Sequence, residues 1–166
     1  FDYLIIDKAT SGNIILANDV TVHQTLTLTK GLINTSASAL LTISSTGSTT
    51  SGNTNSYING PLAKIGNSAF VFPVGKAGKF AKIEISAPSA SSTFTAEYFK
   101  TSPSNRSNLG SGLTGGIVSS VEYWELGPAS GTPSANVTLH WNDNSFTGIS
   151  SSSSADLVVA HYTSGN

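Results

Sequence analysis

The amino-acid sequence predicts an all-β protein in which a short right-handed parallel β-helix is followed by an antiparallel β-sandwich. No segment keeps apolar residues at helical spacing, because Gly, Ser, Thr and Asn interrupt every long window. Short apolar runs between polar turns fill the chain to about residue 60, and longer alternating segments follow. We therefore expect two parts: β-helix coils at residues 1–55 and a β-sandwich at residues 56–166.

The first part contains apolar runs that are too short to bury a face alone. Stacked coils of a β-helix would give each run a neighbour above and below, whereas irregular hairpins are the alternative that the pattern leaves open. Small polar turns rich in Gly, Asn and Ser separate the runs. The runs are Leu4–Ile6, Ile14–Leu16, Val20–Val22, Leu26–Leu28, Leu32–Ile33 and Leu40–Ile43.

A polar stretch follows these runs. Residues 44–56 contain only Gly, Ser, Thr and Asn, which is typical of a surface loop or of a seam between two units. We place the boundary between the two parts at this stretch.

The second part has longer strands with true alternation. In Ala81–Ile85 the apolar side chains point one way, and Lys82 and Glu84 point the other way, as in a half-buried antiparallel strand. About seven such strands are expected, a number typical of a β-sandwich. They are Tyr57–Ile65, Phe70–Val74, Ala81–Ile85, Thr93–Lys100, Val118–Leu126, Ala135–Trp141 and Asp156–Tyr162.

Composition argues against several partners. Charged residues make up 10% of the 166 residues, the net charge is −1, and the basic residues are scattered, so nucleic acid is not an expected partner. No apolar run reaches the length of a membrane helix, so no membrane insertion is expected. The chain has neither Cys nor Met, so exposure outside the cell would do it little oxidative harm.

Four stretches carry a family resemblance through their order and spacing. They are Asn13–Ile33 with its Val-Thr-Val and Leu-Thr-Leu runs, Ser56–Leu62, Phe70–Lys76 and Val121–Leu126. Together they resemble modules in large surface and secreted proteins of the phylum Bacteroidota that leave the cell by type IX secretion. The resemblance implies an extracellular location and a multi-domain parent, such as an adhesin, a gliding-related protein or a polysaccharide-degrading enzyme. It transfers no catalytic residues.

The sequence offers little catalytic machinery. His23, His140 and His161 lie in different strands, and no Ser stands in a G-x-S-x-G elbow. Glu122 and Glu125 are three positions apart on a strand and so face opposite sides, and we expect them to be solvent-facing rather than a paired acid and base. We expect no enzyme activity and no organic cofactor.

Two candidate binding sites remain. Tyr123 and Trp124 are aromatic residues that could stack on sugar rings, although alternation places one of the two inside and the other outside. Asn142, Asp143 and Asn144 could supply oxygen ligands to Ca²⁺, but Asx-rich turns are also common without an ion.

The sequence thus predicts a non-catalytic extracellular module that builds or anchors a larger bacterial surface or filament protein. Its expected partners are neighbouring domains or copies of the same chain, because exposed strand edges and coil ends are templates for pairing. The alternative is a carbohydrate-binding module appended to a secreted polysaccharide-degrading enzyme, with polysaccharide as its ligand.

Overall fold

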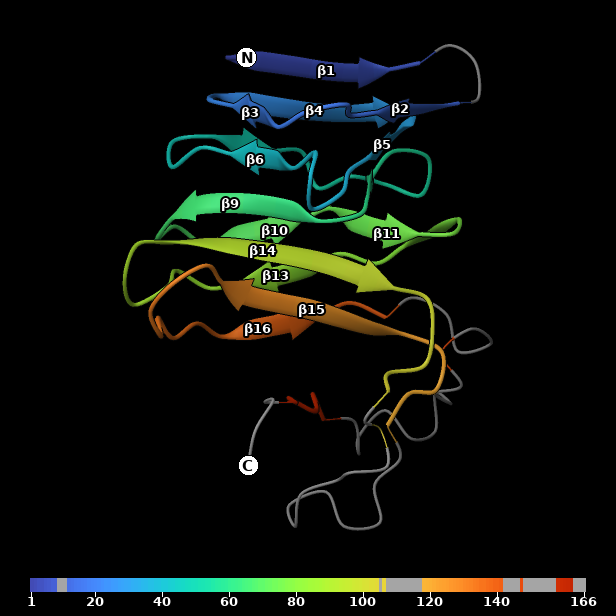
Figure 1. Cartoon of the computed structure of the whole chain (residues 1–166), viewed down its shortest axis with the longest axis vertical. Coiled ribbons are helices and arrows are strands. Elements are labelled where there is room, and N and C mark those ends of the chain that lie inside the picture. Colours follow the sequence, from blue (N-terminus) through green and yellow to red (C-terminus); the bar gives the residue numbers. More distant parts are fainter. Residues whose placement is uncertain (9–11, 105, 107–117, 142–146, 148–157, 163–166) are drawn as a thin grey trace. The chain divides into compact units, whose positions relative to one another are not determined.

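Every element with assigned bounds is a β-strand (Figure 1). The computed structural model describes residues 1–8, 12–104, 106, 118–141, 147 and 158–162. The chain divides into two compact units, one of residues 1–99 and 124–140 and the other of residues 100–123 and 141–166. The prediction of an all-β fold is confirmed, whereas the right-handed β-helix within it is not confirmed and stays a prediction.

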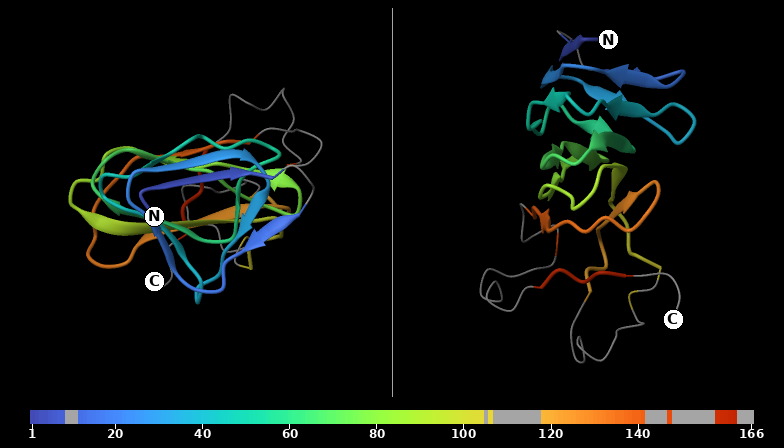
Figure 2. Two further views of the ribbon diagram at one scale, coloured as in Figure 1. Left: turned by 90° about the horizontal axis from the view of Figure 1, so that it is seen from above. Right: turned by 90° about the vertical axis from the view of Figure 1, so that its left-hand side faces the viewer.

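The first nine strands belong in turn to three sheets, and each of the first six pairs in parallel with the strand three elements later. The strands of these sheets run along different sides of the unit in the view from above (Figure 2). The first sheet holds β1 (Tyr3–Asp7), β4 (Thr25–Lys30) and β7 (Ser48–Thr49); the second begins with β2 (Asn13–Ile15), β5 (Leu32–Asn34) and β8 (Ile58–Asn59); the third begins with β3 (Val20–Val22), β6 (Leu41–Ile43) and β9 (Leu62–Gly66).

Most of the pairing after β9 is antiparallel. The remaining strands are β10 (Phe70–Phe72), β11 (Val74–Lys76), β12 (Lys79–Phe80), β13 (Ile83–Ile85), β14 (Ser92–Phe99), β15 (Tyr123–Pro128) and β16 (Val137–Leu139). The second sheet continues from β8 through β11 to β12, and the third continues from β9 through β14 to β15. Strands β10, β13 and β16 form a separate fourth sheet.

The predicted boundary at residue 55 lies inside the first unit. Strand β5 pairs with β8 and β6 pairs with β9, so two sheets continue across this position. Both pairings are parallel, so neither the sheets nor the direction of pairing changes at residue 55; most of the antiparallel pairing begins only after β9.

One hydrophobic core serves both kinds of pairing, with buried members from Ile6 to Tyr98. In the third sheet, Val20, Leu41 and Leu62 are successive ladder partners, and Leu41 and Leu62 are fully buried. The alternation predicted for residues 81–85 is confirmed, since Ala81 and Ile83 are both 1% exposed. Alternate residues therefore point into one interior through both parts of the unit.

A turn divides the strand that was predicted at Tyr57–Ile65. Gly60 has a φ of +135°, and a Cβ atom at this position would collide with the carbonyl oxygen of Thr35. The Thr35 hydroxyl donates to the carbonyl oxygen of Pro61 at 2.7 Å. Only glycine suits both the dihedral angle and the close approach, so β8 ends and β9 begins around it.

The polar stretch at residues 44–56 contains a strand of the first sheet. The amide of Ser48 donates to Gln24 O at 2.7 Å, and the amide of Thr50 donates to Leu26 O at 3.0 Å. The main chain supplies this ladder, so β7 forms without an apolar side chain. The hydrophobic pattern could not reveal it.

Two further expectations can be compared only with the residues that the structure describes. The strand predicted at Asp156–Tyr162 lies mostly outside them, and residues 158–162 carry no strand. Within the described part of the chain, no helix is long and apolar enough to cross a membrane.

Candidate functional site

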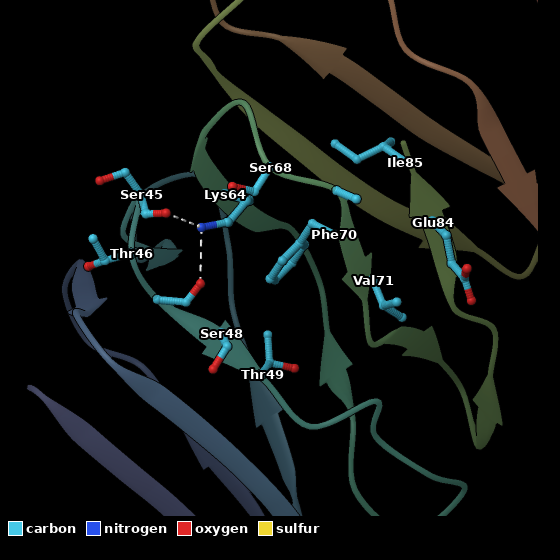
Figure 3. Close-up of a pocket in the computed structure, with 12 residues that line it drawn as sticks. Ser45, Thr46, Ser48, Thr49, Lys64, Ser68, Phe70, Val71, Glu84 and Ile85 are labelled. Atoms are coloured by element: carbon cyan, nitrogen blue, oxygen red, sulfur yellow. Dashed lines mark hydrogen bonds between the residues drawn. The ribbon is translucent and has the colours of Figure 1, made fainter. Parts of the chain in front are cut away.

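A hollow of about 480 Å³ lies in the first unit where the first and fourth sheets approach each other (Figure 3). Ser48 and Thr49 of β7 line it, as do Phe70 and Val71 of β10. Among the described strands, β7 pairs only with β4 and β10 pairs only with β13. The second and third sheets continue past this level, so the hollow marks a break in the ladder on one side of the unit only.

Lys64 projects from β9 into the interior beside this hollow. It pairs with Ile43 on one side and with Phe94 on the other, and it is 4% exposed. Its position in the alternation is therefore one that aliphatic and aromatic residues occupy elsewhere in the same ladder. The aliphatic part of the side chain suits this position, but the ammonium group needs polar partners.

Three main-chain carbonyl groups surround the Lys64 ammonium. The Nζ atom donates to Ser44 O at 2.5 Å, to Ser45 O at 3.0 Å and to Gly47 O at 3.0 Å. It also lies 5.5 Å from the centroid of the Phe70 ring. An ammonium group has three N–H donors, so these carbonyl groups use all of them.

Burial lowers the pKa of Lys64, because it removes the ammonium group from water. The carbonyl dipoles and the face of Phe70 partly offset this cost. The hydrogen bonds of the Lys64 ammonium thus connect strand β9 to the turn between β6 and β7. The ammonium also lies near Phe70 of β10.

Glu84 forms a second charged part of the lining. Its Oε1 atom lies 2.8 Å from Lys82 Nζ and 2.7 Å from His140 Nε2. The hydrogen bond from Lys82 is the largest cause of the lowered pKa of Glu84, and the charges of Lys82 and His140 add to it. His140 follows β16 directly, so this cluster also fastens β16 to β13.

The hollow has no arrangement typical of nucleophilic catalysis among its described contacts. Its hydroxyl side chains are Ser45, Thr46, Ser48, Thr49 and Ser68. The Thr46 hydroxyl donates to the main-chain oxygen of His23, and the hydroxyl groups of Ser48 and Thr25 lie 3.4 Å apart. No described hydrogen bond joins one of these hydroxyl groups to an imidazole or a carboxylate, as activation of a nucleophile requires.

The structure gives Trp124 a packing role. Its indole nitrogen donates to Ala81 O at 2.8 Å, and its ring centroid lies 5.3 Å from that of Tyr98. Tyr123 is half-buried, and neither residue lines the hollow. Sugar stacking by Tyr123 and Trp124 stays a prediction, but the core contacts of Trp124 leave less of its ring free for a ligand.

The other candidate residues are dispersed or undescribed. Asn142, Asp143 and Asn144 lie outside the described residues, so the calcium site stays a prediction. In the part of the chain that is described, no three His, Asp or Glu side chains gather as metal ligands would. Glu125 is exposed as expected, but the expectation was wrong for Glu122, which is 5% exposed.

Comparison of the chain with family models, curated proteins and solved structures finds no match. The geometry of the chain itself is thus the basis on which a function can be proposed. Lys64 is the main residue of that geometry that sequence reasoning missed. The signal was present, because Val22, Ile43 and Lys64 stand at intervals of 21 residues in successive strands.

Proposed function

We propose that this chain is a non-catalytic structural or adhesive module of a larger extracellular protein on a bacterial surface. The observation that carries this proposal is the way in which the first unit uses its buried charge. The Lys64 ammonium uses all three of its N–H donors in hydrogen bonds to main-chain carbonyl oxygens. Such a group strengthens a scaffold and has no proton donor left for a substrate.

We also propose a more detailed architecture for the first unit. The three circuits from β1 to β9 would be coils of a short right-handed β-helix, and the antiparallel strands after them would form a sandwich on the same core. The equal steps from Val20 to Leu41 and from Leu41 to Leu62 support this interpretation. Such a stack would be held along its length because β4, β5 and β6 each pair with a strand on both sides.

The partners that we propose are a neighbouring domain or another copy of the chain. Strands β1, β2 and β3 stand at the ends of their sheets, and each has one paired neighbour among the described strands. The outward side chains of Tyr3 and Ile5 are 66% and 67% exposed, whereas their ladder partners are Thr25 and Thr27. An unpaired edge with exposed apolar side chains is suited to strand pairing with a further segment.

The proposed location rests on the resemblance to surface modules of Bacteroidota that use type IX secretion. The absence of Cys and Met agrees with exposure to oxidants outside the cell. A parent protein of adhesin or filament type would place several such modules between its export signal and its attachment point.

Light scattering and electron microscopy of the isolated chain and of its parent protein test the proposal. We expect a parent that extends from the cell as a stalk or fibre and an isolated chain that self-associates as its concentration rises. A compact, strictly monomeric parent would count against it. So would substrate turnover by the isolated chain that disappears on substitution of Glu84 or His140.

A further inference from the structure

The hollow between β7 and β10 exposes polar groups of two strand edges that have no strand between them. The side chains around its mouth are mostly exposed, including Ser45, Thr46, Ser48 and Ser68. Its volume of about 480 Å³ lies within the roughly 300–1,000 Å³ of small-molecule sites. A ligand of modest size could therefore enter without displacing the core.

The charges at the hollow argue against an ionic ligand. An anion would find no free donor on Lys64 and would approach the carbonyl oxygens of Ser45 and Gly47. A cation would approach the Lys64 ammonium, and the Glu84 carboxylate already contacts Lys82 and His140. Each charge at the site is thus satisfied within the protein, which favours a neutral ligand.

The remaining groups suit a ligand that both donates and accepts hydrogen bonds. Hydroxyl groups of Ser and Thr do both, whereas carbonyl and carboxylate oxygens only accept. Phe70, Val71 and Ile85 add apolar surface to the lining. Sugars combine these needs, since their hydroxyl groups donate and accept and their C–H faces are apolar.

We propose that this hollow is a binding site for a neutral saccharide, with Ser45, Ser48 and Ser68 as hydrogen-bonding residues and Phe70 at the apolar side. The site differs from the aromatic pair Tyr123 and Trp124. The proposal goes beyond the structural role, which holds whether or not the hollow is occupied. A negative result here would leave the assembly experiment above unaffected.

Nuclear magnetic resonance titration of the full ¹⁵N-labelled chain tests the proposal. The probes are glucose, galactose, mannose, xylose, N-acetylglucosamine and their β-linked disaccharides, with glucuronate and glucosamine as charged comparisons. Probe concentrations of about 10 mM would reveal dissociation constants near 1 mM. We expect at least one neutral saccharide to shift the amide signals of residues 45–49 and 68–71 in a saturable way.

Two substitutions that fill the hollow serve as tests, and one serves as a control. Ser68→Trp and Ser45→Tyr should each weaken binding at least about tenfold, a loss of about 1.4 kcal/mol. Ser38→Trp changes an exposed serine that does not line the hollow and should leave binding unchanged. The spectrum of each variant reports whether the variant is folded. Because two blocking positions are tested, the experiment remains decisive if one of the two variants does not fold.

Three results would overturn the proposal. The first is the absence of saturable shifts at residues 45–49 and 68–71 with every neutral saccharide. The second is binding of glucuronate or glucosamine that is as tight as that of the best neutral sugar. The third is unchanged binding in folded Ser68→Trp and Ser45→Tyr, which would place the sugar elsewhere.

Discussion

The Nζ atom of Lys64 lies 2.5 Å from the carbonyl oxygen of Ser44, the residue that follows Ile43, the ladder partner of Lys64. A lysine thus occupies an interior position in register with an isoleucine, and its charged end reaches the turn that the isoleucine's own strand enters. One side chain satisfies the carbonyl groups of this turn and fills part of the core. The relationship explains why a charged residue is tolerated at a buried position.

Replacing Lys64 should therefore cost stability. Lys64→Met keeps the length of the side chain but leaves its three carbonyl acceptors without their donor. We expect the free energy of unfolding in urea to fall by about 1.5–3 kcal/mol, the range for hydrogen bonds to charged groups. Lys30→Met is the control at an exposed lysine, and it should cost less than Lys64→Met, because contacts of exposed side chains contribute little to stability. Equal effects of the two substitutions would contradict the role of Lys64.

The absence of a side chain at Gly75 should be important for the packing around it. A Cβ atom there would lie 2.8 Å from the Tyr57 ring and would also meet Lys79 O. We expect Gly75→Ala to destabilise the protein by about 1–3 kcal/mol, the range for overpacking. Gly127→Ala is a matched control in β15, since a Cβ atom there meets nothing within 4 Å. Thermal and urea unfolding of both variants would check the difference, and a neutral Gly75→Ala would contradict the close approach.

Acid should weaken the attachment of β16 to β13 through Glu84. The pKa of Glu84 is lowered in the fold, chiefly by the hydrogen bond from Lys82, so its stabilising effect is present above the pKa of the unfolded state. That effect is lost as the pH falls through the lowered value. We expect Glu84→Gln to remove a pH-dependent contribution of less than about 1 kcal/mol to the free energy of unfolding, because the pair of Glu84 and Lys82 is partly exposed.

Urea unfolding from pH 7 down to pH 3 would measure this contribution as the difference between the wild type and the variant. Glu125→Gln, at an exposed position, is the control that removes a carboxylate outside this cluster. A Glu84→Gln profile that runs parallel to that of the wild type would show that the cluster does not contribute.

Alkaline pH should act through Tyr57. Its hydroxyl oxygen accepts a hydrogen bond from the Gly78 amide at 3.1 Å, and burial raises the pKa of the phenol. The unfolded phenol ionises near pH 10 while the folded one remains protonated, so the wild type should lose stability as the pH rises past that value.

Tyr57→Phe should lack this alkaline loss and should instead cost about 0.5–1.5 kcal/mol at neutral pH, because the Gly78 amide loses its acceptor. Ultraviolet titration of the phenol, combined with urea unfolding, measures both effects. Tyr3→Phe is the control at an exposed tyrosine. Ionisation of every tyrosine at the ordinary pKa in the folded chain would contradict the burial of Tyr57.

The sequence predicted the positions of the strands along the chain better than the pairing between them. Val20–Val22 is a strand with the predicted bounds, and Phe72 and Ile83 are buried as alternation requires. Strand β7 escaped prediction because hydrogen bonds of its main chain hold it, and such bonds leave no hydrophobic pattern. The pairing of distant strands, such as β9 with β14, also leaves no local signal.

The candidate site was harder to predict for a related reason. Aromatic residues drew attention to Trp124, but its indole group is bound to Ala81 and packed against Tyr98. The hollow instead arises where two sheets fail to join, and its polar residues are ordinary serines and threonines in a chain that is rich in both. Only the arrangement of the sheets distinguishes these residues from the others.

Immunogold electron microscopy of intact bacteria that produce the parent protein tests the central claim most directly. Antibodies against this chain should label extended material outside the cell envelope, and the label should disappear when the parent gene is deleted. Label confined to the cytoplasm of sectioned cells, with none on intact cells, would contradict the account of an extracellular structural module.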